Sequence, residues 1–383
     1  MLGKDENKIS FPFSTFIKYG KSGKLDLKNI KPKNENQNSR TSTTIRYLKN
    51  LFFSDAVVLS SVIDIFSSLQ ISREFLNWVN DFNPDFIYTQ PGSRQSIRFI
   101  KRLHELTSIP LVVHIMDDWP NVIGNGLFQR FRAKKTNDEL KQLLDQTKIF
   151  LSISDGMSEE YFSRYGKRFK SFHNTVDVKK WLPFSKKDFN ISNEIKILYA
   201  GRIGLGTYHA FVDLILAIEE LNKAGSNIYI HIQTPQLDNN LRKKLTKFAF
   251  VKFNPYLDYA ELPKVFSIYD LLLLPIDFQS KGQRFLKFSM PTKVPEFMIS
   301  GVPILLYCPA NVYLSSHAER NEWAYIINEK EKKTIKHGIL NLIDNKAIRE
   351  KISKNAVEYA INNFSADVVT EKFRLMFCND DDD

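Results

Sequence analysis

The sequence predicts an α/β protein with two doubly wound domains, each built on a parallel sheet. The chain has 383 residues, which at about 150 residues per domain suggests two domains. Hydrophobic residues make up 43% and charged residues 25%, so disordered, collagen-like and coiled-coil classes are excluded. From Phe75 onward, short apolar runs alternate with helical patterns in two successive cycles. This alternation is typical of buried parallel strands connected by helices.

The two cycles define the expected elements and domains. Strands are expected over residues 85–89, 110–115, 149–153, 195–200, 227–232, 250–253, 270–275, 303–307 and 323–327. Helices are expected over residues 93–106, 126–146, 208–223, 294–300, 346–363 and 366–377, with further helices in the remaining gaps. The expected domains are 1–185 including a linker, 186–365, and a final helix with an acidic tail over 366–383. Residues 1–50 lack the hydrophobic strand and glycine turn that normally open such a domain.

The charge distribution and the cysteine content limit the expected partners and cellular location of the protein. The formal net charge is +11, and residues 1–50 hold eleven basic but only four acidic side chains. This basic segment favours either peripheral contact with an anionic membrane or a solvated flexible stretch. Nucleic acid is disfavoured because no zinc-finger, RNA-recognition or basic-zipper pattern accompanies the charge. Two cysteines, no signal peptide and no apolar stretch of about 20 residues predict a cytoplasmic protein without a membrane span.

The junctions after predicted strands are where an open α/β sheet binds ligands. The run from Tyr199 to Thr207 contains Gly201, Arg202, Gly204 and Gly206 and leads into a helix. Glycines let the backbone approach a phosphate, the helix N-terminus offers amide donors, and an arginine pairs bidentately with a diphosphate. The glycine spacing departs from G-x-G-x-x-G, which disfavours a nicotinamide enzyme.

A second junction runs from Pro291 to Pro303 and opens a short helix. Glu296 stands in its first turn, where it could accept the hydroxyl hydrogens of a ribose, while Lys293 and exposed amides face phosphate. Taken alone, this segment is explained more simply by a solvated glutamate in a helix cap.

Together these segments resemble the donor half of a GT-B glycosyltransferase, most closely the large retaining family 4. The resemblance rests on Tyr-Ala-Gly-Arg, on Leu-Leu-Leu-Leu-Pro ending at Pro275, and on Pro-Thr-Lys-x-x-Glu-Phe-Met-x-Ser-Gly-x-Pro starting at Pro291. It implies a nucleotide-diphosphate sugar as donor substrate, with no separate cofactor, and an acceptor-binding domain before a nucleotide-sugar-binding domain across a cleft. It also implies that the C-terminal helices pack back toward the first domain. The implied donor site comprises Gly201, Arg202, Pro275, Thr292, Lys293 and Glu296.

The first half resembles the same family at the strand ending in His114-Ile-Met-Asp117-Asp118-Trp-Pro and at the run from Ser152 to Asp177. In an inverting enzyme, Asp117, Asp118 or His114 would take the acceptor proton. In a retaining enzyme, as the resemblance implies, these side chains would instead position acceptor or donor sugar. A hydrogen-bonded structural role explains His114 equally well. No metal is expected, because adjacent residues in an extended loop point in opposite directions and no His/Cys cluster completes a site.

This sequence departs from the family's residue pattern at two positions, so alternative functions stay open. Many family members carry a second glutamate eight residues before the ribose-binding one, and here Phe288 occupies that position. A lysine that commonly follows the Gly-Arg strand is absent, and Lys281, Arg284 or Lys287 could replace its charge. The expected function is sugar transfer to a saccharide or lipid-linked acceptor in surface polysaccharide synthesis. The alternatives are a degenerate GT-B module that binds nucleotide or a partner without turnover, and a GT-B epimerase or glycogen-type synthase.

Overall fold

The computed structural model describes residues 6–9, 67–122, 127–234, 237–255 and 257–378. Most of the basic N-terminal segment and the acidic residues 380–383 lie outside the described residues, so the predictions made for them stay predictions. The described part divides into two compact units. One comprises the described residues up to Ile115 together with Trp119–Leu151 and Tyr161–Phe169, and the other comprises Met116–Asp118, Ser152–Glu160 and the chain from Lys170 onward.

The first sheet has four strands in the order β3-β4-β5-β6. Their bounds are β3 (Ile87–Thr89), β4 (Leu111–Ile115), β5 (Thr147–Ser152) and β6 (Lys170–Ser171). The β3 and β4 strands pair in parallel, and every residue of β4 is buried, as its continuous apolar run predicts. A separate antiparallel pair joins β1 (Asn7–Ile9) to β2 (Ser67–Leu69), which the sequence did not lead us to expect.

Polar side chains set the starts of the helices near this sheet. Ser72 accepts a hydrogen bond from the Phe75 amide at the start of α3 (Arg73–Phe82), and Ser93 and Ser96 form a capping box at the start of α4 (Arg94–Thr107). The α4 helix contacts α5 (Leu127–Asp145), and Glu139 of α5 accepts hydrogen bonds from Arg94 and Arg98. The remaining elements here are the 3-10 helix η4 (Trp119–Val122) and α6 (Asp155–Tyr165).

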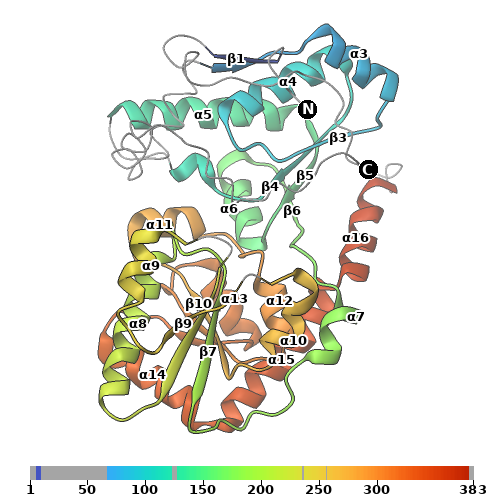
Figure 1. Ribbon diagram of the computed structural model, residues 1–383. Helices are drawn as coiled ribbons and strands as arrows, with labels where there is room; N and C mark the ends of the chain where they lie inside the picture. Colours follow the sequence, from blue (N-terminus) through green and yellow to red (C-terminus); the bar gives the residue numbers. More distant parts are fainter. Residues whose placement is uncertain (1–5, 10–66, 123–126, 235–236, 256, 379–383) are drawn as a thin grey trace. The chain divides into compact units, whose positions relative to one another are not determined.

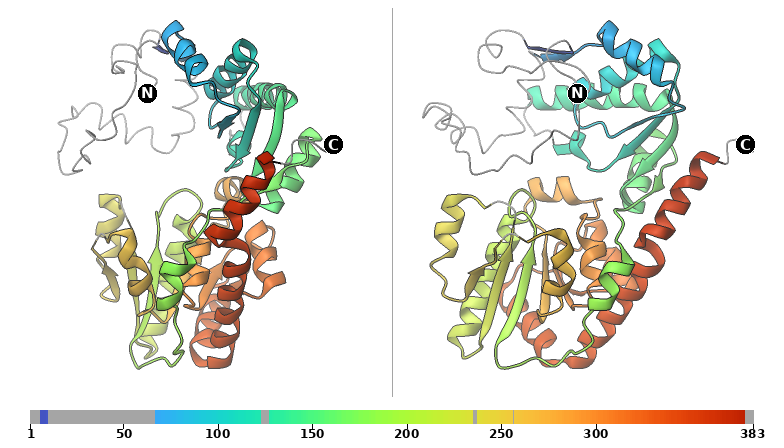
Figure 2. Two further views of the ribbon diagram at one scale, coloured as in Figure 1. Left: turned by 90° about the vertical axis from the view of Figure 1, so that its right-hand side faces the viewer. Right: turned by 45° about the vertical axis from the view of Figure 1, so that its right-hand side comes forward.

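The second unit is a six-stranded parallel sheet in the order β12-β11-β10-β7-β8-β9, with helices on both faces (Figures 1 and 2). The strands are β7 (Ile195–Ala200), β8 (Ile228–Gln233), β9 (Val251–Phe253), β10 (Leu271–Pro275), β11 (Ile304–Tyr307) and β12 (Tyr325–Ile327). Each of the six lies within two residues of a predicted strand, so the doubly wound organisation is confirmed for this unit.

Alternate residues of the central strands feed two separate hydrophobic cores. Leu272 and Leu274 pack on one face and Leu271 and Leu273 on the other. The first core is shared with α7 (Val178–Trp181), α10 (Leu262–Phe266), α12 (Val294–Ile299), α13 (Tyr313–Asn321) and α15 (Lys346–Phe364). The second is shared with α8 (Tyr208–Lys223), α9 (Asn239–Leu245) and α14 (Lys332–Asp344). Both faces of the sheet are therefore covered, and its strand ends are left for loops.

Shorter elements complete the unit. They are the 3-10 helices η5 (Leu182–Phe184) and η6 (Tyr259–Glu261), the helix α11 (Ser280–Leu286) and the last helix α16 (Ala366–Cys378). Among the described residues, no helix is long and apolar enough to cross a membrane.

Candidate functional site: a glycine loop and a buried lysine

The loop after β7 forms the first wall of the candidate site. The chain turns at Gly201 with φ of +134°, a conformation that a residue with a Cβ rarely adopts. The Tyr199 hydroxyl donates a hydrogen bond of 2.6 Å to the Arg202 carbonyl, which fixes the backbone there. The Arg202 side chain is exposed. The loop therefore presents a guanidinium at a rigid turn that directly follows a strand end.

Lys293 reaches the same turn from the segment before α12. Its Nζ donates a hydrogen bond of 2.9 Å to the Ala200 carbonyl and lies 4.7 Å from the Tyr199 ring centroid. A Cβ added to Gly201 would lie 3.0 Å from this Nζ. Burial lowers the pKa of Lys293 to about 8. The structure thus brings together Gly201 and Lys293, and it holds one ammonium in a site that disfavours its charge.

A carboxylate fixes the far side of the glycine loop. The Asp277 backbone amide donates a 2.7 Å hydrogen bond to the Gly206 carbonyl, and Asp277 Oδ1 accepts a 2.8 Å bond from the Ala210 amide in the first turn of α8. Asp277 is only 3% exposed, and burial raises the pKa of this carboxyl. The Ala210 amide therefore already has an acceptor within the protein, and the expectation that the α8 terminus offers amides to phosphate stays a prediction.

The other predicted donor-site residues differ in exposure. Thr292 is exposed, and Pro275 is buried as the last residue of β10. Glu296 lies on α12 and is partly buried; its burial raises the pKa of the carboxyl, and a hydrogen bond from Tyr259 opposes that shift. Tyr259 itself is 50% exposed. A partly buried carboxylate that already accepts one hydroxyl is chemically suited to accept the hydroxyls of a ribose.

The residues predicted near the acceptor lie at the end of β4. His114 is 6% exposed, and its Nδ1 is hydrogen-bonded to the Tyr88 hydroxyl at 2.6 Å. The Asp118 side chain is fully buried. Partial burial also raises the pKa of the neighbouring Asp117 carboxyl. Trp119 donates from Nε1 to the Pro91 carbonyl at 2.6 Å. Whether these residues serve the acceptor stays a prediction.

Sequence reasoning missed Asp277 and Tyr259. Asp277 follows the apolar strand Leu271–Pro275 by two residues, so the strand-end rule could have identified it. No comparable signal marks Tyr259, which reaches Glu296 only through the fold. Within the described ranges, no group of three or more His, Cys, Asp or Glu side chains is arranged to hold a metal ion.

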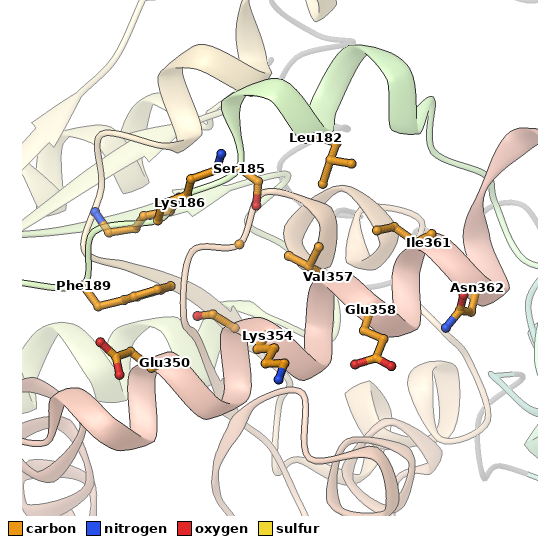
Figure 3. Close-up of a pocket in the computed structure, with 13 residues that line it drawn as sticks. Leu182, Ser185, Lys186, Phe189, Glu350, Lys354, Val357, Glu358, Ile361 and Asn362 are labelled. Atoms are coloured by element: carbon orange, nitrogen blue, oxygen red, sulfur yellow. The ribbon is translucent and has the colours of Figure 1, made fainter.

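A larger pocket lies away from these residues. It has a volume of about 690 Å³ and is lined by the segment Leu182–Phe189 and by α15, from which Val357 and Ile361 project (Figure 3). None of the predicted site residues lines it. The candidate donor site is therefore defined by the strand-end loops and not by this pocket.

The fold is of the GT-B class, in which two α/β domains with parallel sheets occur in one chain. Sucrose-phosphate synthase (tll1590) from Thermosynechococcus elongatus is similar in structure with a TM-score of 0.60 and 14% identity, over 81% of each chain. Anabaena Alr3699/HepE in complex with UDP and glucose matches with a TM-score of 0.59 and 14% identity, over 80% of this chain and 81% of that one. A glycosyltransferase from Rickettsia africae matches with a TM-score of 0.61 and 12% identity, over 80% and 79%.

The fold class predicted from the sequence is confirmed by these structures. No known protein family matches the chain by sequence, and no curated protein does so either. Membership of the retaining family 4 therefore stays a prediction.

Proposed function

We propose that this protein is a glycosyltransferase that moves a sugar from a nucleotide-diphosphate donor to a saccharide or lipid-linked saccharide. The observation that carries the proposal is the junction of Gly201 and Lys293, with Arg202 beside it, at the strand-end loops of the second unit. Similar structures in which UDP and glucose are bound support a nucleotide-sugar donor.

Each side chain has a role that follows from its chemistry. Glycosyl transfer places negative charge on the departing diphosphate, and fixed cations stabilise that charge most strongly where water is scarce. Lys293 supplies a partly buried ammonium and Arg202 a guanidinium that can bind two phosphate oxygens at once. Glu296 would accept the ribose hydroxyls in place of the Tyr259 hydroxyl. Gly201 allows the phosphates to approach the backbone.

The proposal also covers the residues near the acceptor, the stereochemical course of the reaction and its cellular role. Asp117, Asp118 and His114 would position acceptor or donor sugar if the reaction retains the anomeric configuration, or one of them would take the acceptor proton if it inverts. We propose the retaining, metal-independent course that the family resemblance implies. We further propose a role in surface polysaccharide synthesis at the inner face of a membrane.

A second candidate is a module that binds nucleotide without turnover. Phe288 favours it, because an apolar ring stands where many members of the resembled family carry a glutamate. In the structure the Lys287 Nζ lies 4.9 Å from the Phe288 ring centroid, so this ring is covered by a cation and offers no carboxylate.

The test measures nucleotide binding and turnover separately. Calorimetry with UDP, GDP, ADP and CMP should show one nucleotide that binds the wild type and binds Arg202→Ala and Glu296→Ala at least tenfold more weakly, because a hydrogen bond to a charged group contributes about 1.5–3 kcal/mol. Arg374→Ala is the matched control, because this exposed arginine forms an ion pair with nearby Glu371 on α16, which carries no predicted site residue.

Turnover then separates the two candidates. Acceptor-dependent release of the nucleoside diphosphate from its sugar conjugate supports the transferase, and binding without release supports the module. Equal affinity of all four proteins for every nucleotide would contradict both candidates.

A further inference from the structure

The pocket of about 690 Å³ that is lined by the segment Leu182–Phe189 and by α15 has no part in the candidate donor site. Its α15 wall is one face of the helix, because the lining residues recur at intervals of three and four: Glu350, Ser353, Lys354, Val357, Glu358, Ile361 and Asn362. At 1.5 Å per residue, this face is about 18 Å long. Leu182 lies at the Ile361 end of the face and Phe189 at the Glu350 end (Figure 3). The pocket is therefore a long groove, whose two walls run in opposite directions along the chain.

Hydrogen bonds hold the wall that faces α15 in place. The Lys186 amide donates a 2.8 Å bond to the Ser300 carbonyl at the end of α12. Arg349 of α15 donates a 2.8 Å bond from Nη2 to the Phe189 carbonyl. Gly301 has a φ of +66°, and a Cβ added to it would lie 3.1 Å from the main-chain nitrogen of Lys186. Because this wall is fixed both to α12 and to α15, the groove is preformed.

Two residues that line the groove carry polar groups without a hydrogen-bond partner in the part of the chain that the structure describes. The Ser353 hydroxyl is the first, on a residue that is only 2% exposed. The Lys186 ammonium is the second: its Nζ lies 4.0 Å from Asp270 Oδ1, too far for a hydrogen bond, and burial lowers the pKa of this lysine. Leaving such donors unsatisfied costs the fold free energy. A ligand that brings an acceptor oxygen into the groove would recover that cost.

The half of the groove toward Phe189 carries positive charge. The lysines that line it are Lys186, Lys187 and Lys354. The carboxylate in this half, Glu350, is already paired with Lys346 at 3.7 Å. A ligand group that lies here is therefore attracted if its charge is negative.

The half of the groove toward Leu182 is apolar. Val357 and Ile361 project from α15 toward Leu182 in the opposite wall (Figure 3). Glu358 is exposed at the edge of this half, where it disfavours a second negative group. This half suits a hydrocarbon chain, whose burial strengthens binding about fourfold for each CH₂ group.

We infer that this groove binds a single-chain amphiphile with a carboxylate head, of the chemical class of a long-chain fatty acid. The carboxylate lies in the half that holds Ser353 and Lys186 and accepts hydrogen bonds there. The hydrocarbon chain extends between Leu182 and the Val357 and Ile361 side chains. A pocket of this volume is in the range that small-molecule ligands occupy. The inference goes beyond the proposed function and does not rest on it, because no donor-site residue lines the groove.

Isothermal titration calorimetry, below the concentrations at which micelles form, tests the chain and the head separately. The wild type should bind dodecanoate. It should bind octanoate at least tenfold more weakly, because that chain is shorter, and dodecyltrimethylammonium at least tenfold more weakly, because that head is a cation. Leu182→Glu should weaken dodecanoate at least tenfold. Leu216→Glu is its matched control, because Leu216 is 37% exposed against 38% for Leu182 but lies on α8 outside the groove.

Ser353→Ala tests the head group against a merely structural role. It should weaken dodecanoate at least tenfold and should not lower Tm, because the hydroxyl has no partner in the described structure to lose. Ser315→Ala is the matched control: Ser315 is also 2% exposed, but it donates a 3.1 Å hydrogen bond to Asn328 and does not line the groove. This variant should lower Tm and bind dodecanoate as the wild type does.

The inference is overturned if dodecanoate does not bind the wild type, or if it binds the wild type, Leu182→Glu and Ser353→Ala alike. Equal affinity for dodecanoate and dodecyltrimethylammonium would also overturn it, because the lysine half would then not select a carboxylate. Sedimentation velocity without amphiphile covers a different occupant: a dimer that Leu182→Glu abolishes would make the groove an interface between two copies of this chain. Absence of nucleotide binding would count against the proposed function alone and leave the dodecanoate result to decide this inference.

Discussion

Lys293 gives the candidate site a measurable pH dependence. In the free protein, burial holds the pKa of this ammonium at about 8, so it loses its proton as the pH rises through that value. A diphosphate beside it favours the charged form and raises this pKa. Below pH 8 the lysine is already charged and affinity is at its maximum. Above pH 8 binding must take up a proton, so affinity should fall by up to tenfold per pH unit.

Isothermal titration calorimetry between pH 7 and 9.5, in buffers of different ionisation enthalpy, measures both the affinity and the proton uptake. Lys293→Met should bind the nucleotide weakly and with no pH dependence in this window. Constant wild-type affinity from pH 7 to 9.5 would place the ammonium away from the phosphates.

The sequence indicated the segments of the candidate site but not the contacts between their side chains. Gly201 and Lys293 were predicted to belong to one site because the two segments that contain them together resemble the donor half of a GT-B glycosyltransferase. The hydrogen bond from Tyr259 to Glu296 could not be predicted, because it depends on where a 3-10 turn comes to rest against α12. Apolar periodicity in the sequence predicts where strands and helices lie along the chain. Side-chain contacts between loops depend on tertiary packing, which that periodicity does not reveal.

At the scale of the element, α8 depends on a hydrogen-bond acceptor from the loop that follows β10. Thr207, the residue before the helix, makes no side-chain hydrogen bond to its first amides, and Asp277 accepts from the Ala210 amide instead. Asp277→Ala should therefore lower the free energy of unfolding by about 1–2 kcal/mol, as loss of a helix cap does, and should also weaken nucleotide binding because the Gly206 loop loses its anchor. Asp277→Asn keeps an acceptor oxygen and should change both quantities less.

Urea unfolding and calorimetry on the same samples measure the two effects. Asp238→Ala is the matched control, because Asp238 accepts hydrogen bonds from the Asn240 and Leu241 amides at the start of α9, which carries no predicted site residue. It should lower stability by a similar amount without changing the affinity for nucleotide. Equal loss of affinity in both variants would mean that Asp277 acts only through general stability.

The same reasoning explains which elements the sequence revealed. All six strands of the second sheet were predicted because each is a short apolar run between helical patterns. The two-residue strand β6 and the β1–β2 pair were missed, because each of these three strands contains at most one apolar residue and so shows no apolar run.

At the scale of the whole molecule, the two compact units each have a buried core, and only one carries the candidate donor site. A ligand stabilises the part of the chain that binds it, by about 2.7 kcal/mol at one hundred times its dissociation constant. Scanning calorimetry should therefore show two transitions, of which saturating nucleotide raises only the one that belongs to the second unit.

A matched pair of core variants assigns the transitions. Leu144→Ala in the first unit and Leu272→Ala in the second both truncate fully buried leucines, so each should lower its own transition by an amount equivalent to about 2–5 kcal/mol. Arg202→Ala should abolish the shift that nucleotide produces and leave the other transition in place. A single transition that nucleotide and both leucine variants move together would show that the units unfold as one, and that the donor site draws its stability from the entire chain.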